Sequence, residues 1–288
     1  MKTKSIATGA LFLGLLLGLV GILALNYGRL TPGHLEMGSA SWFIVFGAAL
    51  MTGYIDTCVG GGHGTILTPI LVLVGFPATM VVPAILLSEI GIGLLATILN
   101  HRAGNIHLAQ GGQHRRVLLV LSICAFVGSI IAVTAAVKLP PKWVDLYIGL
   151  VVIAVGLLLL FGRHLFQGFS MKRIAVLGTI ASFNKGISGG GFGPLLTSGQ
   201  VLSGVSEKGA VSITPPARGL TGFISVVMYF IFRGRLELGL ALPLILGSLL
   251  AIPAAVLTVK AIDAAALRKG IILTTLVLGS LLVIRALH

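Results

Sequence analysis

The chain has 288 residues, of which 56% are hydrophobic and only 9% are charged, and its mean hydropathy is +1.09. An ordinary globular domain carries about 25% charged residues, so this composition excludes a soluble globular protein and predicts an all-α polytopic membrane protein. The net charge of +13 would suggest nucleic-acid binding in a soluble chain. Here Lys and Arg fall mainly in short connections between apolar runs, where they set orientation in the membrane, and no nucleic-acid partner is expected.

Apolar runs of the roughly 20 residues that a bilayer requires follow one another along the chain. The first run resembles a signal peptide, but it is long and has no small-x-small cleavage site before Asn26, so we expect an uncleaved first helix within residues 1–30. Eight full spans are predicted, at 6–25, 40–58, 78–100, 115–137, 142–162, 208–232, 238–259 and 268–287. Shorter apolar runs at 64–74, 172–185 and 193–203 fit spans, half-helices or re-entrant segments. No soluble domain is left over.

Two similar glycine clusters interrupt this pattern. The stretch "CVGGGHGTILTPIL" at 58–71 resembles "GISGGGFGPLLTSG" at 186–199. Aligning their glycines gives an offset of 189 − 60 = 129, which also places Gly64 on Gly193 and Thr68 on Thr197. The sequence therefore predicts two similar transporter repeats, at 40–163 and 172–287, after the N-terminal helix.

The number of crossings in each repeat decides their relative orientation. Counting the short runs after the glycines as crossings gives five segments per repeat, and an odd number turns the second repeat upside down. With the N-terminus inside, most Lys and Arg residues of the connections then lie on the inner side. The predicted fold is two inverted five-segment repeats with glycine-broken or re-entrant helices, plus one extra N-terminal helix.

Ionisable residues also lie inside the apolar segments. Inserting a charged side chain at the centre of a membrane helix costs roughly 2.5 to 3.5 kcal/mol, so these residues should face a cavity or one another. The offset of 129 relates an acid in one repeat to a base in the other. It aligns Asp56 with Lys185 and Glu89 with Arg218.

Small and polar residues follow two of these charges at helical spacing. Such stripes fit a transport path, and they also fit seams for close helix packing. The stripes are Glu89, Gly93, Ala96, Thr97 and Asn100 in one repeat, and Arg218, Gly222, Ser225 and Tyr229 in the other.

The glycine clusters predict a binding site for a small anion. Non-helical backbone at membrane depth needs protein or a water-filled cavity around it, and a helix that starts after each cluster directs its positive N-terminus at the break. Paired interruptions in two inverted repeats are typical of transporter sites near the bilayer midplane. The predicted substrate-binding residues are Gly60, Gly61, Gly62, His63, Gly64, Thr65, Asn184, Lys185, Ser188, Gly189, Gly190, Gly191, Phe192 and Arg218, and the predicted proton-coupling residues are Glu89 and Asp56. His63 is a third candidate for proton coupling, since an unperturbed imidazole titrates near neutral pH, and it also fits a histidine bonded to neighbouring backbone.

Two long motifs resemble the signature halves of the TauE/SafE sulfite exporter family, over about residues 40–287. They are "GYIDTCVGGGHGTILTPILVLVG" with "NHRAGNIHL", and "FNKGISGGGFGPLLTSGQVLSGVSEKGAV" with "FRGRLEL". The resemblance implies a multi-pass carrier in the cytoplasmic membrane of a prokaryote. It further implies transport of sulfite, sulfoacetate or a related sulfur oxyanion or organosulfonate, coupled to protons. The chain departs from the family pattern at His63, where many members have glycine, and at the "PPAR" of residues 215–218.

The sequence also fits two other kinds of protein. A passive anion channel would use the same cations and glycines, but it has no need for Glu89 and Asp56. Residues 186–189 match the G-x-S-G of rhomboid-type proteases, yet Ser188 needs a base and the only later histidine is His288.

We expect no enzymatic activity, no cofactor and no metal. His101, His107 and His114 lie in or beside one basic connection without a carboxylate, and Cys58 and Cys124 are expected to be buried, reduced thiols. The expected partners are a small anion, protons and the lipid bilayer, and a homo-oligomer is compatible with the sequence.

Overall fold

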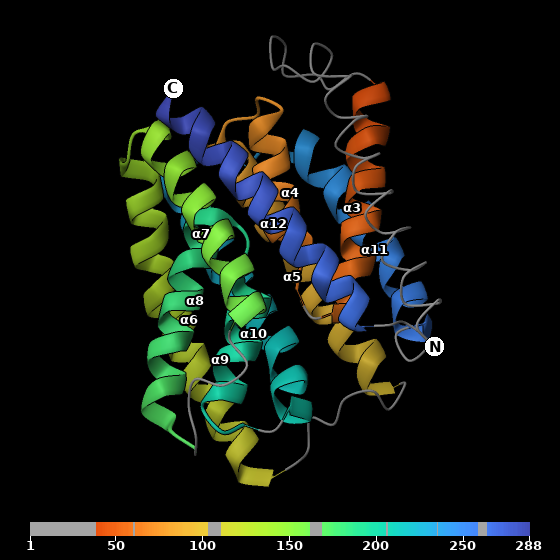
Figure 1. The fold of residues 1–288 in the computed structure, drawn as a ribbon, viewed down its shortest axis with the longest axis vertical. Helices are drawn as coiled ribbons and strands as arrows, with labels where there is room; N and C mark the ends of the chain where they lie inside the picture. The colour runs from red at the N-terminus through yellow and green to blue at the C-terminus, as the bar shows by residue number, and fades with distance from the viewer. Residues whose placement is uncertain are drawn as a thin grey trace.

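The computed structural model describes residues 39–59, 61–102, 111–161, 169–205, 207–234, 236–258 and 264–288. Within these ranges the regular structure is entirely α-helical (Figure 1). The helices are α3 (Ser39–Val59), α4 (His63–Leu73), α5 (Ala78–Arg102), α6 (Gly111–Lys138), α7 (Pro141–Phe161), α8 (Met171–Ser188), α9 (Phe192–Leu202), α10 (Glu207–Arg233), α11 (Leu238–Thr258) and α12 (Ala264–Leu287). The predicted helix at 6–25, Gly60 and His107 lie outside the described residues.

Seven of the described helices are long and apolar enough to cross a membrane. They are α3, α5, α6, α7, α10, α11 and α12, and they coincide with seven of the eight predicted spans. Large apolar side chains on their outer faces are exposed, including Phe43, Leu94, Ile123, Phe223 and Leu250. Because such surfaces are stable only against lipid or another apolar surface, the chain is a multi-pass membrane protein.

Two helices are much shorter than a membrane span. α4 and α9 have 11 residues each, so at 1.5 Å per residue each is about 16 Å long, roughly half of the 30 Å hydrocarbon core. Both therefore have the length of half-helices. Figure 1 shows α4 towards the top of the view and α9 towards the bottom.

Glycines separate each half-helix from the long helix before it, as the sequence predicted. Gly189 and Gly191 have φ angles of 68° and 74°, and Gly62 has a φ angle of 149°. A positive φ angle is energetically costly for residues that have a Cβ atom. The chain therefore leaves α8 at Gly189 and enters α9 at Gly191, whereas Gly62 precedes α4.

The two halves of the chain pack mainly against each other. α3 lies along α11, α8 lies along α6, α5 lies along α10 and α7 lies along α12. With the offset of 129, α3 corresponds to α8, α5 to α10, α6 to α11 and α7 to α12. Exchanging equivalent helices converts the pair α3–α11 into α8–α6 and leaves α5–α10 and α7–α12 unchanged. The set of packed helix pairs therefore stays the same when the equivalent helices of the two halves are exchanged, as expected of two similar units.

The stripe headed by Glu89 serves close helix packing. A Cβ atom added to Gly93 on α5 would lie 2.8 Å from the Cα atom of Gly219 on α10, so the two backbones touch at this crossing. Thr97 donates a hydrogen bond to the carbonyl of Gly93 in its own helix. At the end of the other stripe, the buried Tyr229 donates a hydrogen bond to the carbonyl of Gly186, at 3.0 Å. The crossing of Gly93 and Gly219 is therefore a packing seam between α5 and α10.

Candidate functional site

The two glycine breaks contact each other inside the helix bundle. A Cβ atom added to Gly190 would lie 2.5 Å from the carbonyl carbon of Gly64 and 2.6 Å from the backbone nitrogen of Thr65. The N–H group of Gly191 donates a hydrogen bond to Thr65 Oγ1, at 2.8 Å. The first turn of α4 therefore rests directly on the turn between α8 and α9.

We predict that Thr65→Val destabilises this contact by about 1–3 kcal/mol, because it leaves the buried N–H of Gly191 without its acceptor. The measurement is thermal unfolding of the purified protein in lipid nanodiscs. Thr65→Ser is the matched control, since it keeps the hydroxyl and removes only a methyl group. Equal stability of the Val and Ser variants would contradict a structural role for this hydrogen bond.

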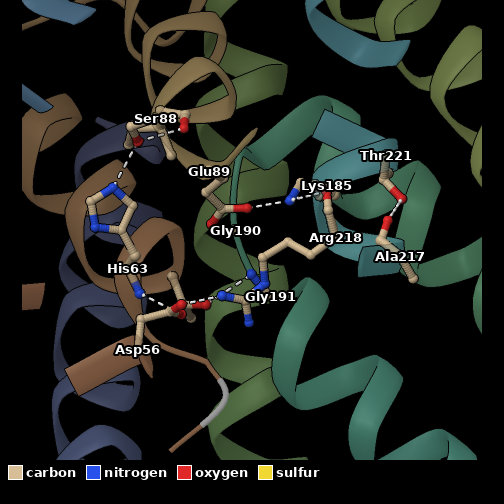
Figure 2. A network of polar contacts seen from close by, with 12 residues as sticks. Asp56, His63, Ser88, Glu89, Lys185, Gly190, Gly191, Ala217, Arg218 and Thr221 are labelled. Atoms are coloured by element: carbon tan, nitrogen blue, oxygen red, sulfur yellow. Dashed lines mark hydrogen bonds and ion pairs between the residues drawn. The ribbon is translucent and has the colours of Figure 1, made fainter. Parts of the chain in front are cut away.

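The predicted membrane charges face one another in two buried ion pairs. Lys185 on α8 pairs with Glu89 on α5, and 0% and 5% of these side chains are exposed. Arg218 on α10 pairs with Asp56 on α3, with 6% and 2% exposed. Figure 2 shows both pairs in one network. Each carboxylate comes from the first half and each cation from the second, so the pairs hold the two halves together.

The sequence offset of 129 relates the two ion pairs to each other. With the offset of 129, Asp56 becomes Lys185 and Arg218 becomes Glu89, so one ion pair is converted into the other with its charges reversed. Lys185 Nζ also donates to the carbonyl of Arg218, at 3.2 Å, which joins the pairs into one cluster. The four groups carry a formal charge of +2 − 2 = 0 when all are ionised.

His63 lies at the start of α4 beside this cluster. Its backbone N–H donates to Asp56 Oδ1, at 3.2 Å, and its ring nitrogens contact Thr52 and Ser88. The ring is fully buried. Thr52 and Ser88 were not among the predicted site residues, although Thr52 lies one helical turn before Asp56 and Ser88 directly precedes Glu89.

Asn184 and Ser188 shape the turn that carries the second glycine cluster. Asn184 Nδ2 donates to the carbonyl of Gly190, at 3.0 Å, and Ser188 Oγ lies 2.9 Å from the carbonyl of Asn184 and 3.2 Å from that of Gly190. These contacts are local supports for the turn. His288 is exposed at the end of α12 and bonds to Ile284, so the contacts give the G-x-S-G protease interpretation no support.

Most of the predicted binding residues thus come together. Gly61, Gly62, Gly189, Gly190 and Gly191 are buried at the two breaks. Phe192, the first residue of α9, has its ring centroid 5.0 Å from Lys185 Nζ, a distance at which an aromatic face attracts a cation. Gly60 lies outside the described residues. Within the described part of the chain, no cluster of His, Cys, Asp and Glu is arranged to hold a metal ion.

Buried charges beside two half-helices that each follow a glycine break are typical of membrane transport proteins. The chain matches the family described as Sulfite exporter TauE/SafE over residues 44–282, and it belongs to this family. The protein is therefore a transmembrane transporter of the TauE/SafE family. No curated protein and no solved structure gives a match.

Proposed function

We propose that this protein is a secondary transporter that moves sulfite, sulfoacetate or a related sulfur oxyanion or organosulfonate across the cytoplasmic membrane together with protons. The observation that carries the proposal is the buried cluster of Lys185, Arg218, Glu89 and Asp56 beside the contact between the two glycine breaks. Family membership supports the substrate class.

The cluster has the groups that a sulfur oxyanion needs. Arg218 presents a planar guanidinium that can bind two oxygen atoms at once, whereas Lys185 supplies a compact point charge. α4 and α9 begin at the breaks, so the positive ends of both half-helices lie nearby. A bound anion would replace Glu89 and Asp56 as the partner of these cations.

Charge balance supports coupling to protons. The four ionised groups sum to zero, so a bound monoanion leaves the buried cluster with one net negative charge. A buried uncompensated charge is costly, and one proton taken up with the anion removes that cost. The carboxylates Glu89 and Asp56 are the proton acceptors predicted from the sequence.

Alternating access follows from the repeat if the two halves are inverted. The exchange of the ion pairs and of the packed helix pairs supports a twofold axis between the halves, and we propose that this axis lies in the membrane plane. Rocking of one half against the other would then expose the same cluster to each side in turn.

The test is flux of labelled sulfite into proteoliposomes with an imposed pH gradient and a clamped membrane potential. We expect uphill flux that follows the gradient. We further predict that Arg218→Met lowers anion affinity at least tenfold, about 1.4 kcal/mol, because it removes the two-oxygen contact. Arg116→Met, at an exposed position on α6, is the matched control.

Two outcomes would contradict the proposal. Flux that only dissipates a sulfite gradient, whatever the pH gradient, would identify a passive anion channel. Unchanged sulfite affinity in Arg218→Met and Lys185→Met, in variants that are inserted and folded, would limit both cations to a structural role.

A further inference from the structure

His63 has an unusual hydrogen-bonding environment for a buried histidine. Both ring nitrogens contact hydroxyl groups of neighbouring helices. Nδ1 lies 3.0 Å from Thr52 Oγ1 on α3, and Nε2 lies 2.9 Å from Ser88 Oγ on α5. Figure 2 shows His63 between Ser88 and Asp56, directly beside the two ion pairs.

Each of the two hydroxyls also lies within hydrogen-bonding distance of a carbonyl oxygen in its own helix. Thr52 Oγ1 lies 2.8 Å from the carbonyl oxygen of Ala48, and Ser88 Oγ lies 2.7 Å from that of Ile85. A carbonyl oxygen can only accept a hydrogen bond, and a hydroxyl has only one hydrogen to donate. When both hydroxyl hydrogens point to these carbonyls, both hydroxyls present lone pairs to the ring. In that arrangement a doubly protonated His63 can donate from both ring nitrogens.

A neutral His63 ring can also have both of its nitrogens hydrogen-bonded at this position. If Thr52 or Ser88 turns its hydroxyl hydrogen from its helix carbonyl to the ring, the deprotonated nitrogen gains a donor. The adjustment is a single rotation about one side-chain bond. A group whose charged and neutral forms are both hydrogen-bonded suits reversible proton transfer.

The carboxylates have no such alternative. A proton on Glu89 would remove the counter-charge of Lys185, whose other described hydrogen bond is to the Arg218 carbonyl. A proton on Asp56 would do the same to Arg218. Either event would remove the carboxylate charge that directly contacts a buried cation, which is strongly unfavourable unless an anion takes its place.

The charged groups around His63 come from four helices. They are Asp56 on α3, Glu89 on α5, Lys185 on α8 and Arg218 on α10. α7 and α12 also pack against α4, but no charged group of their described residues acts on the ring. Since the four groups sum to zero, a protonated His63 gives the cluster a net charge of +1.

We propose that His63 carries the proton that accompanies the transported anion, an inference that rests on the proposed function of this site. Because an uncompensated buried charge is costly, the monoanion enters the neutral empty cluster together with the proton that gives His63 its positive charge. The bound anion neutralises that charge, so the complex crosses without a net buried charge. Deprotonation of His63 on the other side then weakens the anion's binding and releases it.

The first experiment measures the protonation state of the His63 ring as a function of pH. We would record ¹⁵N NMR spectra of the full-length protein in nanodiscs, with ring-labelled histidine, from about pH 5 to about pH 8. His63→Gln assigns the signal, and His101→Gln, at an exposed site, is the control. We expect two N–H signals from the ring at the acidic end, and we expect methanesulfonate, a monoanion throughout this range, to move the titration to higher pH.

The second experiment measures linkage between anion and proton. In the wild type, the methanesulfonate Kd should rise about tenfold for each pH unit above the His63 titration, as binding linked to one proton requires. His63→Gln, which stays neutral, should bind weakly with no pH dependence over the same range. His63→Gly is a second variant that makes the break all glycine and tests the same loss if the glutamine variant does not fold.

The outcomes separate this inference from the proposed function. A His63 ring that stays neutral while methanesulfonate binds would overturn the inference alone. So would a pH slope that persists in His63→Gln but vanishes in Glu89→Gln or Asp56→Asn, because it would place the proton on a carboxylate. If neither sulfite nor methanesulfonate binds or crosses, the proposed function fails, and with it the role of His63 in coupling.

Discussion

The Gly190→Ala variant is expected to lose about 3 kcal/mol of stability and most of its sulfite flux. The added methyl group would lie 2.5 Å from the carbonyl carbon of Gly64 and 2.6 Å from the backbone nitrogen of Thr65. These are backbone atoms, so no side-chain rotation relieves the overlap, and the cost should be at the upper end of the roughly 1–3 kcal/mol typical of overpacking. Thermal unfolding in nanodiscs and flux into proteoliposomes measure the two effects.

Other glycines of the chain provide the controls for this substitution. A Cβ atom added to Gly47 on α3 or to Gly239 on α11 meets nothing within 4 Å, so Gly47→Ala and Gly239→Ala should keep both stability and flux. If Gly190→Ala behaves like these two variants, the breaks before α4 and α9 do not touch in the membrane. Loss of flux without loss of stability would place the effect in the transport cycle and not in the packing.

The helices were predictable because their cause is local. A run of about 20 apolar residues must form a helix in a bilayer, and a cluster of glycines favours a break wherever φ must be positive, as at Gly189 and Gly191. The seven described spans therefore follow the sequence closely. The apolar runs of α4 and α9, which have 11 residues each, fitted several kinds of segment, because the length of a run alone does not separate a half-helix from a short span.

The pairing of the charges was only partly predictable. The offset of 129 identifies Asp56 and Lys185 as equivalent positions, but equivalence does not say which residues touch. Contact depends on how the helices of the two halves pack against each other. In this packing Asp56 pairs with Arg218, and Lys185 pairs with Glu89. The sequence did show that acid and base must face each other or a cavity, because buried charges need partners.

The hydrogen bonds of His63 could not be predicted from spacing. Thr52 lies 11 residues before His63 and Ser88 lies 25 residues after it, on two different helices. A hydroxyl residue in a membrane helix most often bonds its own backbone, as Thr52 and Ser88 also do. Only the packing of α3 and α5 around α4 shows that the same hydroxyls also contact the ring.

Lys185→Met should be the most damaging of the charge substitutions. It leaves Glu89 buried, with 5% of its side chain exposed and its ion-pair partner removed, and loss of one partner of a buried ion pair typically costs about 3–5 kcal/mol. The double variant Lys185→Met with Glu89→Gln removes both charges, so we expect it to recover most of the lost stability. It should not recover anion binding, because the positive charge is still missing. Thermal unfolding and methanesulfonate affinity, measured on the same samples, test both expectations.

The comparison between the single and double variants separates the two roles of this ion pair. Lys172→Met, at an exposed position on the same helix, controls for the general effect of removing a lysine and should change neither stability nor affinity. If the double variant is as unstable as the single one, Lys185 contributes through its packing against Phe192 more than through its charge. If the double variant binds methanesulfonate as tightly as the wild type does, Lys185 is not part of the anion site, and Arg218 with His63 must supply the positive field.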